Sequence, residues 1–380
     1  MTIFSYSVPR QIFYGEGSLE KLAVLTGKRA AIVTGANSMK RLGFLDKAAA
    51  FLKQAGMESI VIDGVEPNPS VETVWRGARA MQEFQPDWIV AIGGGSAIDA
   101  AKVMWCFYEH PNLKFEEIIP VGAMPALRNK ARFAAIPSTS GTASEITAFS
   151  VITDTAKHIK YPIVSADIVP DIAILDPLLP AAMPMDVTAN TGMDVMAHAV
   201  EAIASIAATP MTDATALEAI KLVFANLPVV YAEPGNMAAR LNMHQASALA
   251  GMAFSNASLG LVHALAHSVG GGFSLPHGQV CAILLPYVID FNRNFSDKYA
   301  MVEKALGIVD LALSVRALNQ KLSLATRFID LIDESRFKES FESLCSQAYA
   351  DPCRFTNPGQ PDLAPVKQIL AQAFYGQVPR

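Results

Sequence analysis

Cysteine is scarce in this chain of 380 residues. The four cysteines form no Cys-x-x-Cys pair; they are Cys106, Cys281, Cys345 and Cys353. Neither a disulfide scaffold nor a thiolate zinc site is therefore indicated. Because reduced thiols are typical of the cytoplasm, we expect a cytoplasmic protein.

Runs of positive charge are also missing. Lys and Arg number 30 against 35 Asp and Glu, a formal net charge of -5, which argues against a nucleic-acid partner. Every apolar stretch is interrupted by a charge or a proline before it reaches ~18 residues, so we expect no membrane span. The first residues show no basic segment followed by an apolar run, so we expect no secretory signal. The mean hydropathy of +0.28 is nevertheless high, and the surplus apolar surface must lie in a core or a subunit interface.

The first half of the chain alternates between apolar, β-branched runs and helical periodicity. We predict strands at 30–34, 59–63, 88–92 and 133–136, and helices at 42–54, 70–85 and from 97 onward. This alternation is typical of an α/β domain with a mostly parallel sheet and helices on both faces.

The character of the sequence changes near residue 185, after which Ala, Met and Leu dominate with a 3.6-residue period. We predict helices at 188–208, 213–224, 237–254 and 259–269, further helices between 299 and 344, and another near 365–375. The run Gly270-Gly271-Gly272 should end the fourth of these helices. The sequence therefore predicts two domains, 1–185 and an all-helical 186–380.

Histidines and a carboxylate recur at helical spacing in the second domain. Asp194 and His198 stand at i and i+4, as do His263 and His267, and His277 follows in a Pro-His-Gly turn. The i, i+4 spacing puts each pair on one helix face. One carboxylate and up to four imidazoles suit Fe, Zn, Co or Ni. The alternative is that these are hydrogen-bonded core histidines or simple helix side-chain contacts.

Two polar loops follow predicted strands in the first domain. Gly93-Gly94-Gly95-Ser96 leads from a strand into a helix, where glycines and free N–H groups can cradle a phosphate. The segment from Pro137 to Glu145 follows another strand at its carboxyl end, where open α/β sheets bind ligands. The alternatives are a capping box formed by Ser96 and Asp99, and a merely polar connection.

Taken together, these segments resemble the iron-containing (group III) alcohol dehydrogenases over nearly the whole chain. The matching segments are Gly93-Gly94-Gly95-Ser96-Ala97-Ile98-Asp99-Ala100-Ala101-Lys102, Pro137-Ser138-Thr139-Ser140-Gly141-Thr142-Ala143-Ser144-Glu145, Gly192-Met193-Asp194 with His198, the run from Ala250 to Gly260, His263, His267 and Leu275-Pro276-His277-Gly278. These motifs are long and ordered, and so they are jointly specific.

The resemblance implies a Rossmann-like dinucleotide-binding domain, a helical metal domain and an active site between them. It implies that Asp194, His198, His263 and His277 bind one divalent metal, Fe²⁺ first and Zn²⁺ or another ion as alternatives. His267 matches a position near the nicotinamide and substrate, where it could relay a proton. The implied reaction is hydride transfer between NAD(P) and a small primary alcohol or diol and its aldehyde.

The resemblance also implies further binding residues and a homodimer or larger homo-oligomer. The residues implied for the cofactor are Gly35, Asn37, Asn68, Gly93, Gly94, Gly95, Ser96, Asp99, Thr139, Ser140, Thr142, Phe149, Lys160, Leu179 and His267. Those implied for the substrate pocket are Phe149 and Phe254.

The chain departs from the family pattern at Gly35, where many NAD-preferring members carry Asp. A carboxylate there would accept the ribose hydroxyl and repel a 2′-phosphate. No acidic residue occurs from Gly35 to Arg41, and Lys40 and Arg41 are basic. We therefore favour NADP over NAD; the alternative is a turn that admits both cofactors.

The tract from Leu306 to Cys353 departs most from the family's usual sequence. Two other functions remain open on this scaffold. One is a lyase or cyclase like dehydroquinate synthase, which needs cationic residues for an acidic substrate, whereas the neighbours of the predicted metal residues, such as Met193 and Met196, are apolar. The other is a cofactor-binding sensor without catalysis, against which the intact set of predicted ligands argues.

Overall fold

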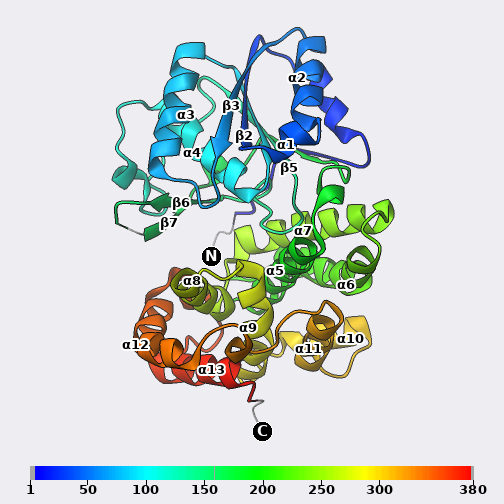
Figure 1. Ribbon diagram of the computed structural model, residues 1–380, viewed down its shortest axis with the longest axis vertical. Helices are drawn as coiled ribbons and strands as arrows, with labels where there is room; N and C mark the ends of the chain where they lie inside the picture. Colours follow the sequence, from blue (N-terminus) through cyan, green and yellow to red (C-terminus); the bar gives the residue numbers. More distant parts are fainter. Residues whose placement is uncertain (1–4, 158, 378–380) are drawn as a thin grey trace. The chain divides into compact units, whose positions relative to one another are not determined.

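The computed structural model describes residues 5–157 and 159–377. The backbone divides into two compact units, Met1–Ala182 and Met183–Arg380 (Figure 1). Within the described residues, the β-strands all lie in the first unit, and the second unit is helical. The predicted fold class, an α/β unit followed by a helical one, is confirmed.

The first unit is built on a six-stranded parallel sheet with the strand order β1-β8-β5-β4-β2-β3. Its strands are β1 (Gln11–Tyr14), β2 (Arg29–Gly35), β3 (Glu58–Val65), β4 (Trp88–Gly93), β5 (Arg132–Pro137) and β8 (Ile172–Leu175). Its α-helices are α1 (Ser38–Arg41), α2 (Phe44–Gln54), α3 (Val71–Phe84) and α4 (Gly95–Glu109). The four predicted strands correspond to β2, β3, β4 and β5, which lie side by side in the order β5-β4-β2-β3. The prediction missed the short strands β1 and β8, which pair with each other in parallel.

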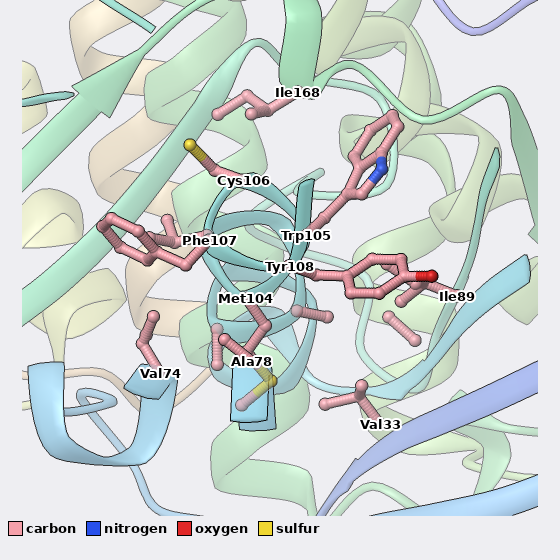
Figure 2. Packing of buried hydrophobic residues seen from close by; sticks show 14 of the residues in the cluster. Val33, Val74, Ala78, Ile89, Met104, Trp105, Cys106, Phe107, Tyr108 and Ile168 are labelled. Atoms are coloured by element: carbon pink, nitrogen blue, oxygen red, sulfur yellow. The ribbon is translucent and has the colours of Figure 1, made fainter. Parts of the chain in front are cut away.

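Helices cover both faces of this sheet, as the alternation predicted. Ala31 and Val33 of β2 pack in the cluster that contains α3 and α4. Ala30 and Ile32 point the other way, into the cluster that contains α2. Figure 2 shows the first cluster, in which Met104, Trp105 and neighbouring side chains of α4 lie among the sheet and α3.

An antiparallel hairpin, β6 (Phe149–Asp154) and β7 (Ile159–Val164), stands apart from the main sheet. It was not predicted. Lys102 on α4 is fully buried beside it, and its Nζ donates to the carbonyl oxygens of Thr147 at 2.6 Å and Phe149 at 2.8 Å. A buried ammonium group that satisfies backbone carbonyls therefore fixes the start of the hairpin.

The second unit consists of helices joined by short loops (Figure 1). They are α5 (Met185–Ala204), α6 (Pro210–Ala232), α7 (Met237–Ala257), α8 (Leu261–Phe273), α9 (His277–Asn292), α10 (Lys298–Leu306), α11 (Leu311–Lys321), α12 (Glu334–Ala350) and α13 (Leu363–Tyr375). The helices predicted between 299 and 344 correspond to α10, α11 and the first part of α12. Gly307 ends α10 in the left-handed region at φ 66°, and Asp310 and Asp333 cap the starts of α11 and α12.

The prediction that Gly270-Gly271-Gly272 ends a helix is wrong. Helix α8 continues through these glycines to Phe273. The residue that follows, Ser274, has φ 55° and ends the helix. A Cβ at Gly272 would lie 3.0 Å from the Leu344 side chain of α12. The absence of a side chain at this position lets α8 and α12 pack closely.

Helix α6 is long and apolar enough to pass as a membrane span by length and composition, and so is the pair α7 and α8, despite its bend of 105°. Core helices pass the same test. The buried positions of α6 recur every three or four residues and include Ala216, Ala219, Ile220, Val223 and Leu227. This spacing is typical of a helix that packs one face against its neighbours, here α5 and α7.

Candidate metal centre and cofactor loops

Asp194 and His198 lie one turn apart on α5, and both are buried. The Oδ1 atom of Asp194 is 3.8 Å from Nε2 of His198. The predicted substrate-pocket residue Phe254 lies on α7 and stacks on the His198 ring, with ring centroids 4.2 Å apart. An apolar aromatic face therefore borders this part of the centre and restricts the orientation of the imidazole.

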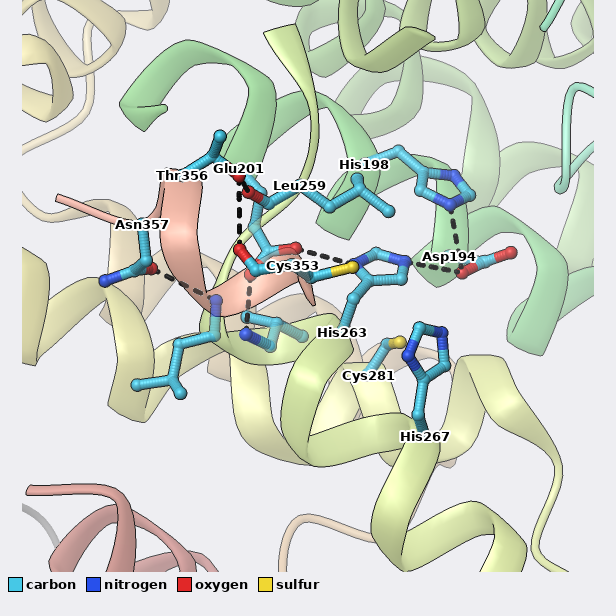
Figure 3. A network of polar contacts seen from close by, with 12 residues as sticks. Asp194, His198, Glu201, Leu259, His263, His267, Cys281, Cys353, Thr356 and Asn357 are labelled. Atoms are coloured by element: carbon cyan, nitrogen blue, oxygen red, sulfur yellow. Dashed lines mark hydrogen bonds and ion pairs between the residues drawn. The ribbon is translucent and has the colours of Figure 1, made fainter. Parts of the chain in front are cut away.

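His263 comes from α8, and Glu201 on α5 fixes its orientation (Figure 3). Nδ1 of His263 is 2.6 Å from Oε2 of Glu201, and Oε1 accepts from the backbone N–H of Val262 at 2.5 Å. Because the carboxylate accepts both bonds, the imidazole carries its proton on Nδ1. When this ring is neutral, the lone pair of Nε2 lies on the side of Asp194, whose Oδ1 is 3.7 Å away.

His277 is the first residue of α9, and its Nε2 lies 3.5 Å from Oδ1 of Asp194. The close contact of α9 with α5 depends on Gly278. A Cβ at that position would overlap the backbone of Asn190. The glycine therefore brings the first turn of α9, with His277, up to the helix that carries Asp194.

Three imidazole nitrogens thus surround one carboxylate oxygen at 3.5 to 3.8 Å, too far for ordinary hydrogen bonds. Among the described residues, neither Oδ1 of Asp194 nor Nε2 of His263 has a hydrogen-bond partner, although both residues are buried. Two donors about 2.1 Å from one ion, at a tetrahedral angle, are roughly 3.4 Å apart. The donors therefore fit a divalent ion, and their chemistry suits iron or zinc.

The pKa shifts favour a cation among these groups. Burial would raise the pKa of Asp194, but the neighbouring histidines hold it well below its usual range. Burial and the other histidines outweigh Asp194 and lower the pKa of His277 to about 3, so this ring is neutral and able to bind a metal. Burial opposes protonation of His263, but Glu201 and Asp194 raise its pKa to about 9, so a metal at this site displaces a proton from Nε2.

A thiol that sequence reasoning missed also lies here. The Sγ atom of Cys281 is 3.5 Å from Nε2 of His277, one turn earlier on α9. Donor atoms of Asp194, His263, His277 and Cys281 all lie within 4.8 Å of one another, and His198 is not one of these four. A search for Cys-x-x-Cys pairs overlooks this thiol, whereas the i, i+4 spacing of His277 and Cys281 points to it.

His267 lies one turn after His263 on α8, with its side chain 47% exposed. Its Nδ1 is 2.8 Å from Oδ2 of Asp351, a residue that follows α12 and was not predicted. Burial would raise the pKa of Asp351, but the hydrogen bond to His267 contributes to lowering it. The ionised carboxylate therefore accepts a hydrogen bond from the Nδ1–H group of His267. The ring also stacks on that of His277, with centroids 5.6 Å apart.

The two predicted phosphate loops lie side by side in the first unit. Gly35, Gly93 and Pro137 end the adjacent strands β2, β4 and β5 at one edge of the sheet. The backbone N–H of Ser138 donates to the carbonyl of Gly93 at 2.8 Å. Backbone groups from both loops are therefore available at the carboxyl edge, where such sheets bind ligands.

Helix α4 begins at Gly95, two residues before the predicted start. Gly94 occupies the N-cap position and no side chain caps the helix, so the alternative of a capping box from Ser96 and Asp99 is wrong. Asp99 instead accepts a hydrogen bond from the backbone N–H of Val151 at 3.0 Å. Burial raises the pKa of this carboxyl group. The uncapped helix start leaves backbone N–H donors for an anion.

The structure brings several predicted cofactor residues into pairs. Nζ of Lys160 donates to Oδ1 of Asn68 at 2.7 Å. A Cβ on Gly94 would lie 3.8 Å from the Thr139 side chain, and one on Gly95 would lie 2.7 Å from Oγ1 of Thr142. The remaining predicted positions differ in exposure: Asn37 is exposed, Phe149 is half-buried, Ser140 is buried and Leu179 lies in the core cluster beside α2.

A parallel α/β unit with these loops, followed by a helical unit with a buried oxygen and nitrogen donor cluster, is the arrangement expected of a metal-dependent dehydrogenase. Two family models match the chain. The one described as iron-containing alcohol dehydrogenase matches residues 9–177, and the one described as the C-terminal part of the Fe-containing alcohol dehydrogenase family matches 188–374. The chain belongs to the iron-containing alcohol dehydrogenase family.

Known relatives cover the chain from end to end. The NADPH-dependent butanol dehydrogenase of Clostridium saccharobutylicum is 47% identical over 382 residues, which cover 98% of each chain. The iron-containing alcohol dehydrogenase of Thermococcus thioreducens has 39% identity and a TM-score of 0.92, covering 99% of this chain and 100% of that one. A 1,3-propanediol oxidoreductase structure has 34% identity and a TM-score of 0.91, covering 98% and 100%.

Family membership confirms the predicted reaction class. The protein is an oxidoreductase that acts on alcohols with a nicotinamide cofactor and a divalent metal. The relatives do not support the lyase or cyclase alternative.

Proposed function

We propose that this protein interconverts a small primary alcohol or diol and its aldehyde, with NADP(H) as the favoured cofactor. The observation that carries the proposal is the convergence of three imidazoles on Oδ1 of Asp194. Relatives named as a butanol dehydrogenase and a 1,3-propanediol oxidoreductase support a short alkyl substrate.

Asp194, His198, His263 and His277 hold the metal, with Fe²⁺ favoured. A bound divalent ion lowers the pKa of an alcohol and polarises a carbonyl. Asp194 supplies the negative charge of the site. Glu201 keeps the proton of His263 on Nδ1, so that Nε2 can bind the ion.

His267 moves the substrate proton. Its Nδ1 proton is held by Asp351, which leaves Nε2 as the acceptor, and its exposed side chain can exchange a proton with water. The Phe254 ring, stacked on His198, offers an apolar surface to the alkyl part of the substrate. Phe149 is the second residue that we propose for the substrate pocket.

The two loops at the sheet edge hold the pyrophosphate of the dinucleotide. The uncapped start of α4 and the residues Thr139, Ser140 and Thr142 supply donors. Gly35 and Asn37 border the ribose, and the absence of an acidic residue from Gly35 to Arg41 accommodates a 2′-phosphate. The NADPH dependence in the name of the Clostridium relative supports this preference.

The Asn68–Lys160 pair and Leu179 complete the proposed cofactor site. We also propose a cytoplasmic homodimer or larger homo-oligomer. The high mean hydropathy and exposed apolar side chains, among them Val309 at 98% exposure, support burial of further surface between subunits.

A panel of alcohols and aldehydes tests the proposal, with NAD(H) and NADP(H) and with purified protein loaded with one metal at a time. We expect aldehyde-dependent oxidation of NADPH by the Fe²⁺ form. His263→Ala should lose bound metal and activity while keeping its fold, and His110→Ala, at a half-buried histidine of the first unit, should keep both. Full metal content and turnover in His263→Ala would refute the ligand assignment, and inactivity of every metal form would refute the function.

A further inference from the structure

The thiol of Cys281 is buried at the point where the proposed metal ligands meet. The residue is 0% exposed and lies on α9, one turn after His277. Its Sγ is 3.5 Å from Nε2 of His277, and it shares a group with Asp194 and His263 whose donor atoms lie within 4.8 Å of one another. Figure 3 draws Cys281 in the same network as Asp194, His198 and His263.

The surroundings of this thiol differ from those of a cysteine that only fills a core. Oδ1 of Asp194 and Nε2 of His263 lack hydrogen-bond partners among the described residues, and both belong to the same group of donors. Cys106, by contrast, lies in the apolar cluster that includes Trp105 and Phe107. A sulfur donor at about 2.3 Å and a nitrogen donor at about 2.1 Å from one ion are roughly 3.1 Å apart at a right angle and roughly 3.6 Å apart at a tetrahedral angle. The 3.5 Å between Sγ of Cys281 and Nε2 of His277 falls in this range.

We propose that Cys281 is a fifth protein donor to the metal, bound through its Sγ. The inference rests on the proposed function, because it assumes an ion held by Asp194 and the three histidines. As the metal–sulfur bond forms, the thiol gives up its proton to solvent, since a coordinating thiol is deprotonated. The sulfur also shifts the preference of the site toward Co²⁺, Zn²⁺ and Fe²⁺ and away from Mg²⁺.

Cobalt(II) substitution tests this donor directly, because the visible d–d bands report the bound ion and a near-ultraviolet sulfur-to-cobalt band reports a thiolate ligand. Purified protein is titrated with Co²⁺ alone, as wild type, Cys281→Ser and Cys345→Ser. Cys345 is a matched control, since it is equally buried and lies on α12, outside the donor group. We expect both sets of bands in wild type and Cys345→Ser. In Cys281→Ser we expect only the d–d bands. The Co²⁺ affinity should fall by at least about tenfold, because replacing residues that merely hydrogen-bond to metal ligands already lowers metal affinity by about that factor.

The outcomes separate the two proposals. If Co²⁺ binds to wild type with d–d bands but without the sulfur band, Cys281 is not a donor and the metal site stands. If the sulfur band persists in Cys281→Ser, another cysteine is the ligand. If no Co²⁺ binds to wild type, the metal site itself is wrong. Circular dichroism checks the fold of each variant, and Cys281→Ala repeats the test if the serine variant does not fold.

Discussion

Replacing Glu201 with glutamine changes one atom of the carboxylate and should weaken metal binding. Glu201 accepts two hydrogen bonds, one from Nδ1 of His263 at 2.6 Å and one from the backbone N–H of Val262 at 2.5 Å. A glutamine amide has one oxygen and one NH₂ group, so it can accept only one of these bonds. The other donor must then face an N–H group.

The magnitude follows from this mismatch. A buried donor without an acceptor costs about 1–3 kcal/mol. The imidazole can avoid that cost only by moving its proton to Nε2, where it blocks the proposed metal bond. Either route weakens metal binding. Residues that hydrogen-bond to metal ligands typically contribute about 10–100-fold to metal affinity, or about 1.4–2.8 kcal/mol. We expect the metal dissociation constant of Glu201→Gln to rise by this factor.

The assay is a competition titration with a chelator of known affinity, followed by activity as a function of free metal. Activity of Glu201→Gln should largely return at saturating metal, because Glu201 is proposed to act through His263. Glu303→Gln controls for the loss of a carboxylate charge in the helical unit, because Arg293 at 2.5 Å and the backbone N–H of Leu311 at 2.8 Å both donate to Oε1 of Glu303, and a glutamine oxygen can accept both bonds. An unchanged metal affinity in Glu201→Gln would refute the tautomer argument. Equal losses in both variants would indicate a general effect on stability.

Two further variants test the other parts of the site. His267→Ala should keep its metal but lose about 10²–10⁴-fold in rate, the usual contribution of a general acid or base, with an altered pH profile; loss of the metal would make His267 a ligand. Gly35→Asp has room for its side chain, because a Cβ there would lie in ordinary contact, 3.5 Å from the Val65 carbonyl oxygen. The added carboxylate should repel the 2′-phosphate by about the worth of one charge-assisted contact, cut kcat/KM for NADP(H) by roughly tenfold to hundredfold and spare NAD(H). Gly235→Asp, in an open loop between α6 and α7, controls for the added charge, and equal loss with both cofactors would contradict the ribose argument.

The sequence alone determined the parts of this protein that depend on neighbouring residues. The runs that form β2, β4 and β5 are apolar because they are buried on both faces of a parallel sheet. Asp194 and His198 share a helix face because they stand at i and i+4. The long ordered motifs gave the family, because they span both units.

Local signals were ambiguous where packing decided the structure. A glycine run ordinarily ends a helix, but Gly272 faces Leu344 of α12, and α8 continues past it. Lys102 fixes the first strand of the hairpin β6–β7 through a hydrogen bond to the carbonyl oxygen of Phe149. The two residues are 47 positions apart, so no local pattern shows this contact.

Only the tertiary structure decided which carboxylates accept hydrogen bonds from the histidines. Glu201 and His263 are separated by 62 residues, and His267 and Asp351 by 84. No spacing rule joins such pairs, because their contact depends on how whole helices pack. Cys281 shows both sides of this limit. Its spacing from His277 is local and visible in the sequence, but its nearness to Asp194 follows from the contact of α9 with α5 at Gly278.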